Sequence, residues 1–377
     1  MKKIRRKPKY YKFFTYKYLL IIIFFIFFLD FTYTKFLFRE KKNIGIKHEV
    51  FHHHMLSNYY NLEGGGNVQN YPVAKIYTNS LGFRDFANRE IDLKKKNRII
   101  FIGDSFTFGS LLNFEFTVPG LAYNYFDEKG IEVLNAGVPS YSPSIYYNKI
   151  KFFIEQGLEF SHLVVFIDIS DIEDEAIVYA TDENTQYVKT INQSVLQEKE
   201  NKEKKLKFKI ENFFQKNIII SYTLFKFVKN KIQSMFIFSN KEFIENVVSK
   251  NYKRDKWTID EDIKKEYNLG IQKSIHYMTL LKDTLDKHNI KLTIVVYPWF
   301  TQIYHHDLES IQVKIWEDFS KKNNSQFINL FPVFINDENK NLDIYKKILL
   351  DFIPYDVHWN QNGSKKIFEN FIKDFKY

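Results

Sequence analysis

Cysteine is absent from the 377 residues of this chain. The sequence therefore offers no disulfide framework, no thiolate metal site and no cysteine nucleophile. This absence is compatible with a reducing or an oxidising compartment. No internal repeat is present, and the length is sufficient for one large domain or two smaller ones, each with its own core.

Outside the N-terminal segment, the chain carries no excess of positive charge. The first 42 residues contain twelve basic and two acidic residues, which accounts for the whole net charge of +10. The remaining residues carry 43 basic and 43 acidic side chains. Charge therefore gives no argument for nucleic-acid binding by the globular part, and we expect no nucleic-acid partner.

The N-terminal segment combines a dense basic cluster with an uncharged apolar run at residues 18–29, which aromatic residues extend on both sides. The uncharged run alone is shorter than the roughly 20 residues that cross a bilayer. A buried soluble helix is disfavoured because every face is apolar. A cleaved signal peptide is disfavoured because no small-x-small site follows Leu29. An uncleaved membrane anchor is the remaining interpretation.

The expected topology follows from the position of the basic residues. Residues 1–17 form a cytoplasmic tail, residues 18–38 cross the membrane once, and the rest is extracytoplasmic, since positive segments stay inside. Residues 39–95 are a lead-in with short strand-like pieces. Within it, three consecutive histidines, His52, His53 and His54, point in different directions, and we expect no metal there.

From residue 96 onward, short apolar strands alternate with helical stretches. This alternation predicts an α/β domain over residues 96–377, with a parallel sheet covered on both faces. A polar, charge-rich stretch at about 180–267 interrupts the pattern, and we interpret it as a helical insertion. The five strands are expected at 98–102, 131–134, 163–167, 292–296 and 327–330, and the last helix at about 361–375.

A serine at the end of the first strand is the strongest chemical signal. Gly103-Asp104-Ser105 lies where a strand ends and a helix begins, so the Ser105 hydroxyl is expected at the carboxyl edge of the sheet. A plain capped turn explains the same pattern. Near the C-terminus, Asp356 and His358 lie two residues apart on a loop, and could activate a serine as orienting carboxylate and base.

Two further segments follow strand ends. Gly137 could bring a backbone N–H close to a substrate oxyanion, although an ordinary turn explains it equally well. The acids of Asp168-Ile169-Ser170-Asp171 and of residues 173–175 suggest the first turn of a helix rather than a metal site, since no histidine is nearby in sequence. Trp299 follows the fourth strand and could line the substrate cleft, although packing in the core or at the rim explains it equally well.

In content and order these segments resemble the SGNH/GDSL hydrolase family over residues 96–377, apart from the insertion. The resemblance implies a three-layer flavodoxin-like fold with Ser105 as nucleophile, His358 as base and Asp356 as its partner. Backbone N–H groups of Ser105 and Gly137 would form the oxyanion hole. The two-residue spacing of Asp356 and His358 is similar to that of membrane-associated polysaccharide O-acetyltransferase relatives.

One position departs from the family pattern. Ser170 occupies the place of the asparagine that usually completes the oxyanion hole, and its hydroxyl is a shorter donor that rotates more freely. Losing one such donor costs roughly 3 kcal/mol in comparable sites. We include Ser170 in the predicted oxyanion hole, because a serine hydroxyl can still donate one hydrogen bond.

The expected function is hydrolysis or transfer of an acyl ester without a cofactor. By analogy with the family, the substrate is an O-acylated carbohydrate of the cell envelope or a small ester. Three further residues are expected to line the substrate site: Asp104, Trp299 and Trp359. The alternative is a catalytically weak or inactive envelope protein that binds a glycan or a partner, and Ser170 keeps this alternative open.

Overall fold

The computed structural model describes residues 10–37, 45–63, 74–182, 184–191, 213–214, 216–235, 239–249, 253–336 and 342–377. The chain divides into two compact units, residues 1–42 with 192–238 and residues 43–191 with 239–377. Residues 192–212, a large part of the predicted insertion, lie outside the described residues.

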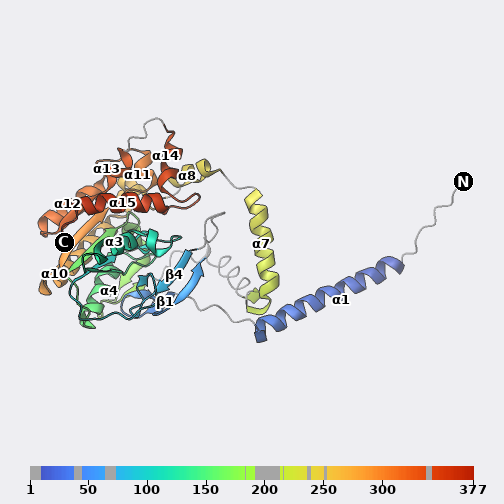
Figure 1. Cartoon of the computed structure of the whole chain (residues 1–377). Coiled ribbons are helices and arrows are strands. Elements are labelled where there is room, and N and C mark those ends of the chain that lie inside the picture. The colour runs from blue at the N-terminus through green and yellow to red at the C-terminus, as the bar shows by residue number, and fades with distance from the viewer. Residues whose placement is uncertain are drawn as a thin grey trace. The chain divides into compact units, whose positions relative to one another are not determined.

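A parallel five-stranded sheet forms the centre of the larger unit (Figure 1). Its strands are close to the predicted ones: β6 (Arg98–Ile102), β7 (Glu132–Asn135), β8 (His162–Ile167), β11 (Lys291–Val296) and β12 (Gln326–Asn329). Their order in space is β7-β6-β8-β11-β12, which is the flavodoxin-like order. The expected fold class is therefore confirmed. The order changes direction between β6 and β8, where such sheets bind their ligands.

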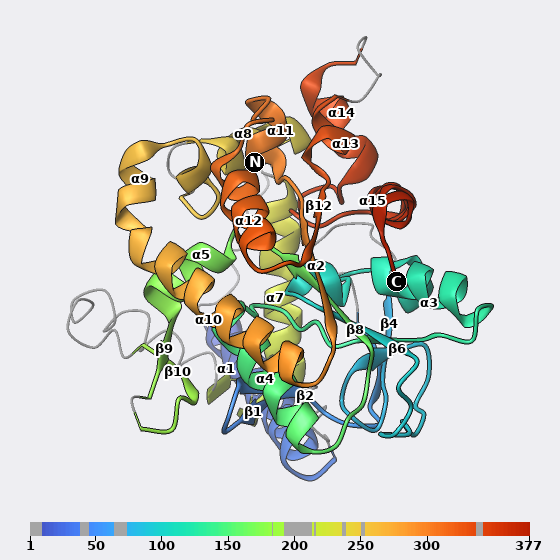
Figure 2. The ribbon, with the colours of Figure 1, turned by 90° about the vertical axis from the view of Figure 1, so that its left-hand side faces the viewer.

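Helices cover both faces of this sheet, as Figure 2 shows. On one face α3 packs against α15, and on the other α4 packs against α10. The three strands β6, β7 and β8 are buried along their whole length because both faces of the sheet are covered. The bounds of the covering helices are α3 (Val118–Asp127), α4 (Pro143–Glu155), α10 (Asn268–Lys287), α12 (Ile311–Lys322) and α15 (Gln361–Asp374). The last of these agrees with the predicted C-terminal helix.

The lead-in extends the sheet with antiparallel strands. β3 (Tyr60–Glu63), β4 (Ala74–Thr78) and β5 (Arg84–Asp85) follow one another, and β5 pairs with β7. A separate hairpin consists of β1 (Gly45–His48) and β2 (His52–Met55). The buried Arg84 side chain donates from Nη1 to the carbonyl oxygens of Phe108 and Gly109, each at 2.6 Å. The lead-in thus supports the short helix that follows β6.

The predicted insertion is only partly helical. It begins with a hairpin, β9 (Tyr179–Thr181) and β10 (Val188–Thr190), where helix had been expected. Its last part belongs to the same unit as the sheet and contains α8 (Asn240–Val248), η5 (Lys256–Thr258) and α9 (Glu261–Glu266). Trp257 is fully buried there and donates its indole N–H to the Ile169 carbonyl at 2.9 Å. This part is therefore core rather than a separate appendage.

The smaller unit contains the N-terminal helix α1 (Tyr10–Thr32), which continues as a π-helical turn η1 (Tyr33–Leu37), and α7 (Ile219–Met235). The segment Tyr18–Leu37 is long and apolar enough to cross a membrane. Most of its described side chains are exposed, but Asp30 and Thr34 are buried.

The remaining short elements lie around the carboxyl edge of the sheet. They are α2 (Ser105–Phe108), η2 (Phe114–Phe116), α5 (Asp171–Glu173), η3 (Asp174–Val178), α11 (Phe300–Tyr304), α13 (Phe331–Ile335) and α14 (Ile344–Asp351). The loops between strands and helices at this edge carry the candidate site.

Candidate active site

The turn after β6 presents Ser105 at the first position of α2. Asp104 caps this helix, since its Oδ1 accepts the N–H of Phe106 at 2.8 Å, and its Oδ2 accepts the Ser105 hydroxyl at 3.2 Å. Gly103 is needed for this tight turn, because a Cβ there would lie 2.2 Å from Thr107 Oγ1 and 2.8 Å from the Phe166 carbonyl oxygen. The local sequence therefore holds the hydroxyl in one place.

His358 reaches Ser105 from the loop between α14 and α15. The His358 Nε2 atom lies 2.7 Å from Ser105 Oγ, although the two residues are 253 positions apart. Asp356 accepts the His358 backbone N–H at 2.9 Å with Oδ1, and the same oxygen contacts the ring Nδ1. The structure thus brings together all three residues of the predicted triad.

The charges around His358 favour its protonated form. Burial lowers the pKa of His358, but the hydrogen bond and charge of Asp356, with the charges of Asp104 and Asp168, raise it above its usual value overall. Burial raises the pKa of Asp356, but the hydrogen bond and charge of His358 bring it below its usual value. This is the electrostatic pattern of a base that must hold a proton during a reaction.

Asp104 has the opposite character. Burial, followed by the charge of Asp168, raises the pKa of Asp104 to about 8. The Phe106 N–H and the charges of His358 and Arg254 act in the other direction without cancelling this effect. The Asp104 carboxyl therefore keeps its proton to higher pH than an ordinary aspartate, and it lies directly beside the Ser105–His358 pair.

The predicted donor Gly137 already has a partner inside the protein. Its backbone N–H donates to Asn135 Oδ1 at 3.0 Å, so it is engaged in holding the loop after β7. A Cβ at Gly137 would lie 2.9 Å from the Phe108 backbone nitrogen. Glycine is required there because the loop packs closely on α2.

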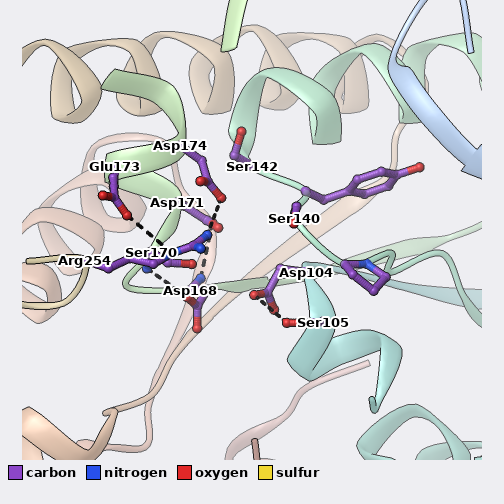
Figure 3. Close-up of polar contacts among 12 residues, drawn as sticks. Asp104, Ser105, Ser140, Ser142, Asp168, Ser170, Asp171, Glu173, Asp174 and Arg254 are labelled. Atoms are coloured by element: carbon purple, nitrogen blue, oxygen red, sulfur yellow. Dashed lines mark hydrogen bonds and ion pairs between the residues drawn. The ribbon is translucent and has the colours of Figure 1, made fainter. Parts of the chain in front are cut away.

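Ser140, which the sequence reasoning missed, has the geometry expected of a backbone donor. Residues 138–141 form a type II turn, with Pro139 second, Ser140 third at a φ of +64°, and Tyr141 N–H donating to the Val138 carbonyl at 3.2 Å. Within the described residues, the Ser140 N–H has no hydrogen-bond acceptor. In the view of Figure 3, Ser140 lies on the side of Asp104 and Ser105. A proline followed by a small polar residue was the available signal.

The histidines of the lead-in support this same turn. The His53 Nε2 atom lies 2.9 Å from the Pro139 carbonyl oxygen, and Tyr141 donates its hydroxyl to the His53 carbonyl at 2.7 Å. His54 Nε2 lies 2.7 Å from the Leu81 carbonyl oxygen. Burial lowers the pKa of His53 to about 4, so this imidazole is neutral. These rings have a structural role, and no cluster of metal-binding side chains occurs among the described residues.

Residues 168–171 form an acidic loop after β8. Asp168 is fully buried, and its Oδ1 accepts the Ser170 N–H at 2.8 Å. Asp174 forms an ion pair with Arg254 at 2.7 Å. In Figure 3, Ser170 lies on the Arg254 side of Asp168, whereas Asp104 and Ser105 lie on the other side. The place of Ser170 in an oxyanion hole therefore stays a prediction.

The three predicted lining residues are all buried. Trp299 is 4% exposed and donates its indole N–H to Asp168 Oδ2 at 2.7 Å, while Trp359 is 2% exposed and packs on Phe106 with ring centroids 4.8 Å apart. Asp104 serves as the helix cap and contacts the Ser105 hydroxyl. A role of these residues in lining the substrate site stays a prediction.

No family model matches the chain, and no curated protein matches it. Similar solved structures include the acetylxylan esterase Axe2 from Geobacillus stearothermophilus, with 12% identity, a TM-score of 0.38, and coverage of 76% of this chain and 97% of that one. Another is the psychrotrophic esterase EstA from Pseudoalteromonas sp., with 10% identity, a TM-score of 0.36, and coverage of 74% and 96%.

A third similar structure is a GDSL-like lipase from Bacteroides thetaiotaomicron, with 12% identity, a TM-score of 0.35, and coverage of 75% and 89%. The similar solved structures named here are thus two esterases and a GDSL-like lipase, and none of them exceeds 12% identity to this chain.

Proposed function

We propose that this chain is a serine-dependent acyl-ester hydrolase in which Ser105 is the nucleophile. The observation that carries the proposal is the continuous chain of contacts from Ser105 Oγ through the His358 ring to Asp356, with 2.7 Å between Oγ and Nε2. A serine hydroxyl is a weak nucleophile without a base, and a histidine oriented by a carboxylate is the base that activates it.

The reaction has two halves. Ser105 Oγ bonds to the ester carbonyl carbon while its proton passes to His358 Nε2, and the negative charge moves to the carbonyl oxygen. Collapse of this intermediate breaks the bond to the alcohol, which leaves with the proton from His358. A water molecule then attacks the acyl-enzyme with His358 again as base, which releases the acid and restores Ser105.

For the oxyanion we propose the backbone N–H groups of Ser105 and Ser140, with the Ser170 hydroxyl as third donor. Ser140 replaces Gly137 in this role because the Gly137 N–H is donated to Asn135. The type II turn that contains Ser140 is braced by His53 through the Pro139 carbonyl. A preorganised donor of this kind stabilises the developing charge without reorganisation during the reaction.

For the substrate we propose an O-acylated carbohydrate of the cell envelope or a small ester, and for the acceptor water or a sugar hydroxyl. The support is the predicted topology, in which α1 crosses the membrane and the basic tail remains in the cytoplasm. Protease added to intact spheroplasts should digest residues 43–377. Protection there, followed by digestion after lysis, would show that the proposed topology is wrong.

The catalytic proposal is tested with the full-length protein in detergent and a short-chain aryl ester, with and without a sugar acceptor. Ser105→Ala and His358→Ala should each abolish measurable turnover while the Tm stays nearly unchanged. Transfer to the sugar at the expense of free acid would identify an acyltransferase. Turnover that survives both substitutions would refute the assignment.

A glycan-binding protein with little or no activity is the second candidate. It is favoured by one observation, that Ser170 stands where related enzymes have an asparagine and that its N–H is donated to Asp168. Wild-type protein that binds an O-acylated oligosaccharide but releases no acid would support it.

A further inference from the structure

Helix α7 of the smaller unit exposes an apolar face. Ile220, Leu224 and Val228 follow one another at four-residue spacing, and Phe225 is their neighbour. The exposed fractions of Ile220, Leu224, Val228 and Phe225 are 54%, 61%, 46% and 66%. Residues four apart lie on the same side of a helix. The exposed Lys226 lies on the opposite side, because at 3.6 residues per turn it is about 200° of rotation beyond Leu224. A contiguous exposed apolar face of this kind marks a surface that has a partner.

The first turn of α7 is bonded directly to the apolar helix α1. The Asp30 carboxylate accepts the N–H of Ile220 at 2.9 Å with Oδ1 and the N–H of Ser221 at 2.7 Å with Oδ2. Thr34 Oγ1 accepts the N–H of Ile219 at 2.9 Å and donates to Asp30 at 3.2 Å. Residues of α1 thus satisfy the N–H groups that a helix start leaves without intrahelical partners.

This cap also explains an acidic residue in an apolar segment. Asp30 lies within the span Tyr18–Leu37, where a lone carboxylate is unfavourable unless it has partners. It is only 3% exposed because α7 covers it. The hydrogen bonds from α7 therefore give the Asp30 carboxylate the partners that it needs within the apolar span.

The depth of Asp30 places the start of α7 near the membrane boundary. Asp30 precedes Leu37, the end of the apolar span, by seven residues, which corresponds to about 10 Å at the helical rise of 1.5 Å per residue. α7 has 17 residues and is about 25 Å long, which is shorter than the roughly 30 Å hydrocarbon core. In Figure 1, α7 diverges from α1 at the end that they share.

The composition of this segment fits the surface of an anionic bilayer. Residues 213–235 contain four lysines and no acidic residue, and Phe213 and Phe214, just before α7, are exposed. A helix with an apolar face, a polar face and a basic charge lies in the plane of the membrane, with the apolar face among the acyl chains. Lysines at its edges interact with anionic head groups.

We propose that α7 is a second membrane-binding element, which lies in the outer interface of the membrane that α1 crosses. Its partner is a phospholipid bilayer that contains anionic lipids, and its contact face consists of Ile220, Leu224, Phe225 and Val228. The inference rests on the proposed anchoring by α1. The chain is then held at the membrane by two segments that are far apart in sequence and joined through Asp30.

The absence of cysteine allows this to be tested with single labels in the full-length protein. Leu224→Cys and Lys226→Cys place an environment-sensitive fluorophore on opposite faces of α7. Phe24→Cys in α1 serves as the lipid reference and Lys365→Cys on the exposed surface of α15 as the aqueous reference. Each protein is reconstituted into vesicles of phosphatidylcholine and phosphatidylglycerol, and quenching by lipids with a spin label on the acyl chain is measured.

The label at Leu224 should be quenched by the lipid spin label to a similar extent as the label at Phe24, and the label at Lys226 several-fold less. Aqueous emission at both α7 positions would overturn the proposal. A blue-shifted but unquenched label at Leu224 would also overturn it, because protein rather than lipid then covers the face. An unquenched label at Phe24 would show instead that the anchor itself was assigned wrongly.

The bond through Asp30 is tested separately. Asp30→Ala removes the cap and should reduce quenching at Leu224 while quenching at Phe24 is unchanged. Asp30→Asn keeps one acceptor oxygen and should give an intermediate value. Equal quenching at Leu224 in all three proteins would refute a role for Asp30 in holding α7 at the membrane.

Discussion

Replacement of Asp356 by asparagine tests how much the negative charge of this residue contributes to catalysis. Asparagine has nearly the same shape and can keep the bond to the His358 backbone N–H, which is 2.9 Å long. It cannot stabilise the imidazolium, because it carries no charge. In a comparable serine site this change costs about 10⁴ in kcat, which corresponds to roughly 5 kcal/mol of transition-state stabilisation.

The pH dependence gives a second, independent signature. The Asp356 charge and hydrogen bond raise the pKa of His358, so their removal lowers it. The acid limb of kcat/KM for an aryl ester should therefore move to lower pH in the Asp356→Asn variant, together with the loss in rate. A Tm measured in parallel separates this loss in rate from any loss of stability.

Asp351→Asn is the matched control. Asp351 lies in the helix before the same loop and forms an ion pair with Lys366 at 2.6 Å, but it is not part of the chain from Ser105 to Asp356. Its replacement should leave kcat within a few-fold of the wild type. Equal losses in both variants, or a loss below about tenfold for Asp356→Asn, would refute the reasoning.

Three other predictions address the surroundings of the triad. Ser170→Asn should preserve or raise kcat/KM because an amide is a better-placed donor. A clear fall would show that residues 168–171 were aligned wrongly with the family pattern. Asp104 has its pKa raised from 3.8 to about 8, so the contribution of this one residue to stability is most favourable below the lower value and falls as pH rises towards the higher one. The Tm advantage of Asp104→Asn over wild type should accordingly grow across this window and level off above it, and a difference independent of pH would contradict the assignment. A Cβ at Gly270 would lie 2.0 Å from the Ile172 carbonyl oxygen, so Gly270→Ala should lower stability by roughly 1–3 kcal/mol through overpacking. Denaturant unfolding should show a smaller loss for Ser274→Ala, and similar losses in the two variants would argue against a close approach of α10 to this loop.

The local sequence pattern was sufficient to predict the five parallel strands and to select the three residues of the triad. The strand predicted at 98–102 has the same bounds as β6, because a short apolar run ending in glycine depends mainly on its neighbours in sequence. Ser105, Asp356 and His358 could be selected because each lies on a recognisable turn after or before a regular element. The resemblance to a known family then supplied their order.

Other features depended on contacts that no local pattern contains. The burial of Trp299 and Trp359 against Phe106 of α2 is one such feature, because the three aromatic rings come from segments that are far apart in sequence. Ser140 was missed because its φ of +64° is enforced by the surrounding turn and its supports rather than by a glycine.

The sequence by itself determined the α/β class, the strand positions and the chemical groups of the triad, because hydrophobic periodicity and turn residues act over a few neighbours. Only the tertiary structure decided which groups meet. The order β7-β6-β8-β11-β12 brings the ends of β6 and β8 to the switch point of the sheet, and packing of α15 brings His358 to Ser105 across 253 positions. Such contacts depend on how whole elements pack, and the free energy of that packing is shared among many residues rather than encoded at any one of them.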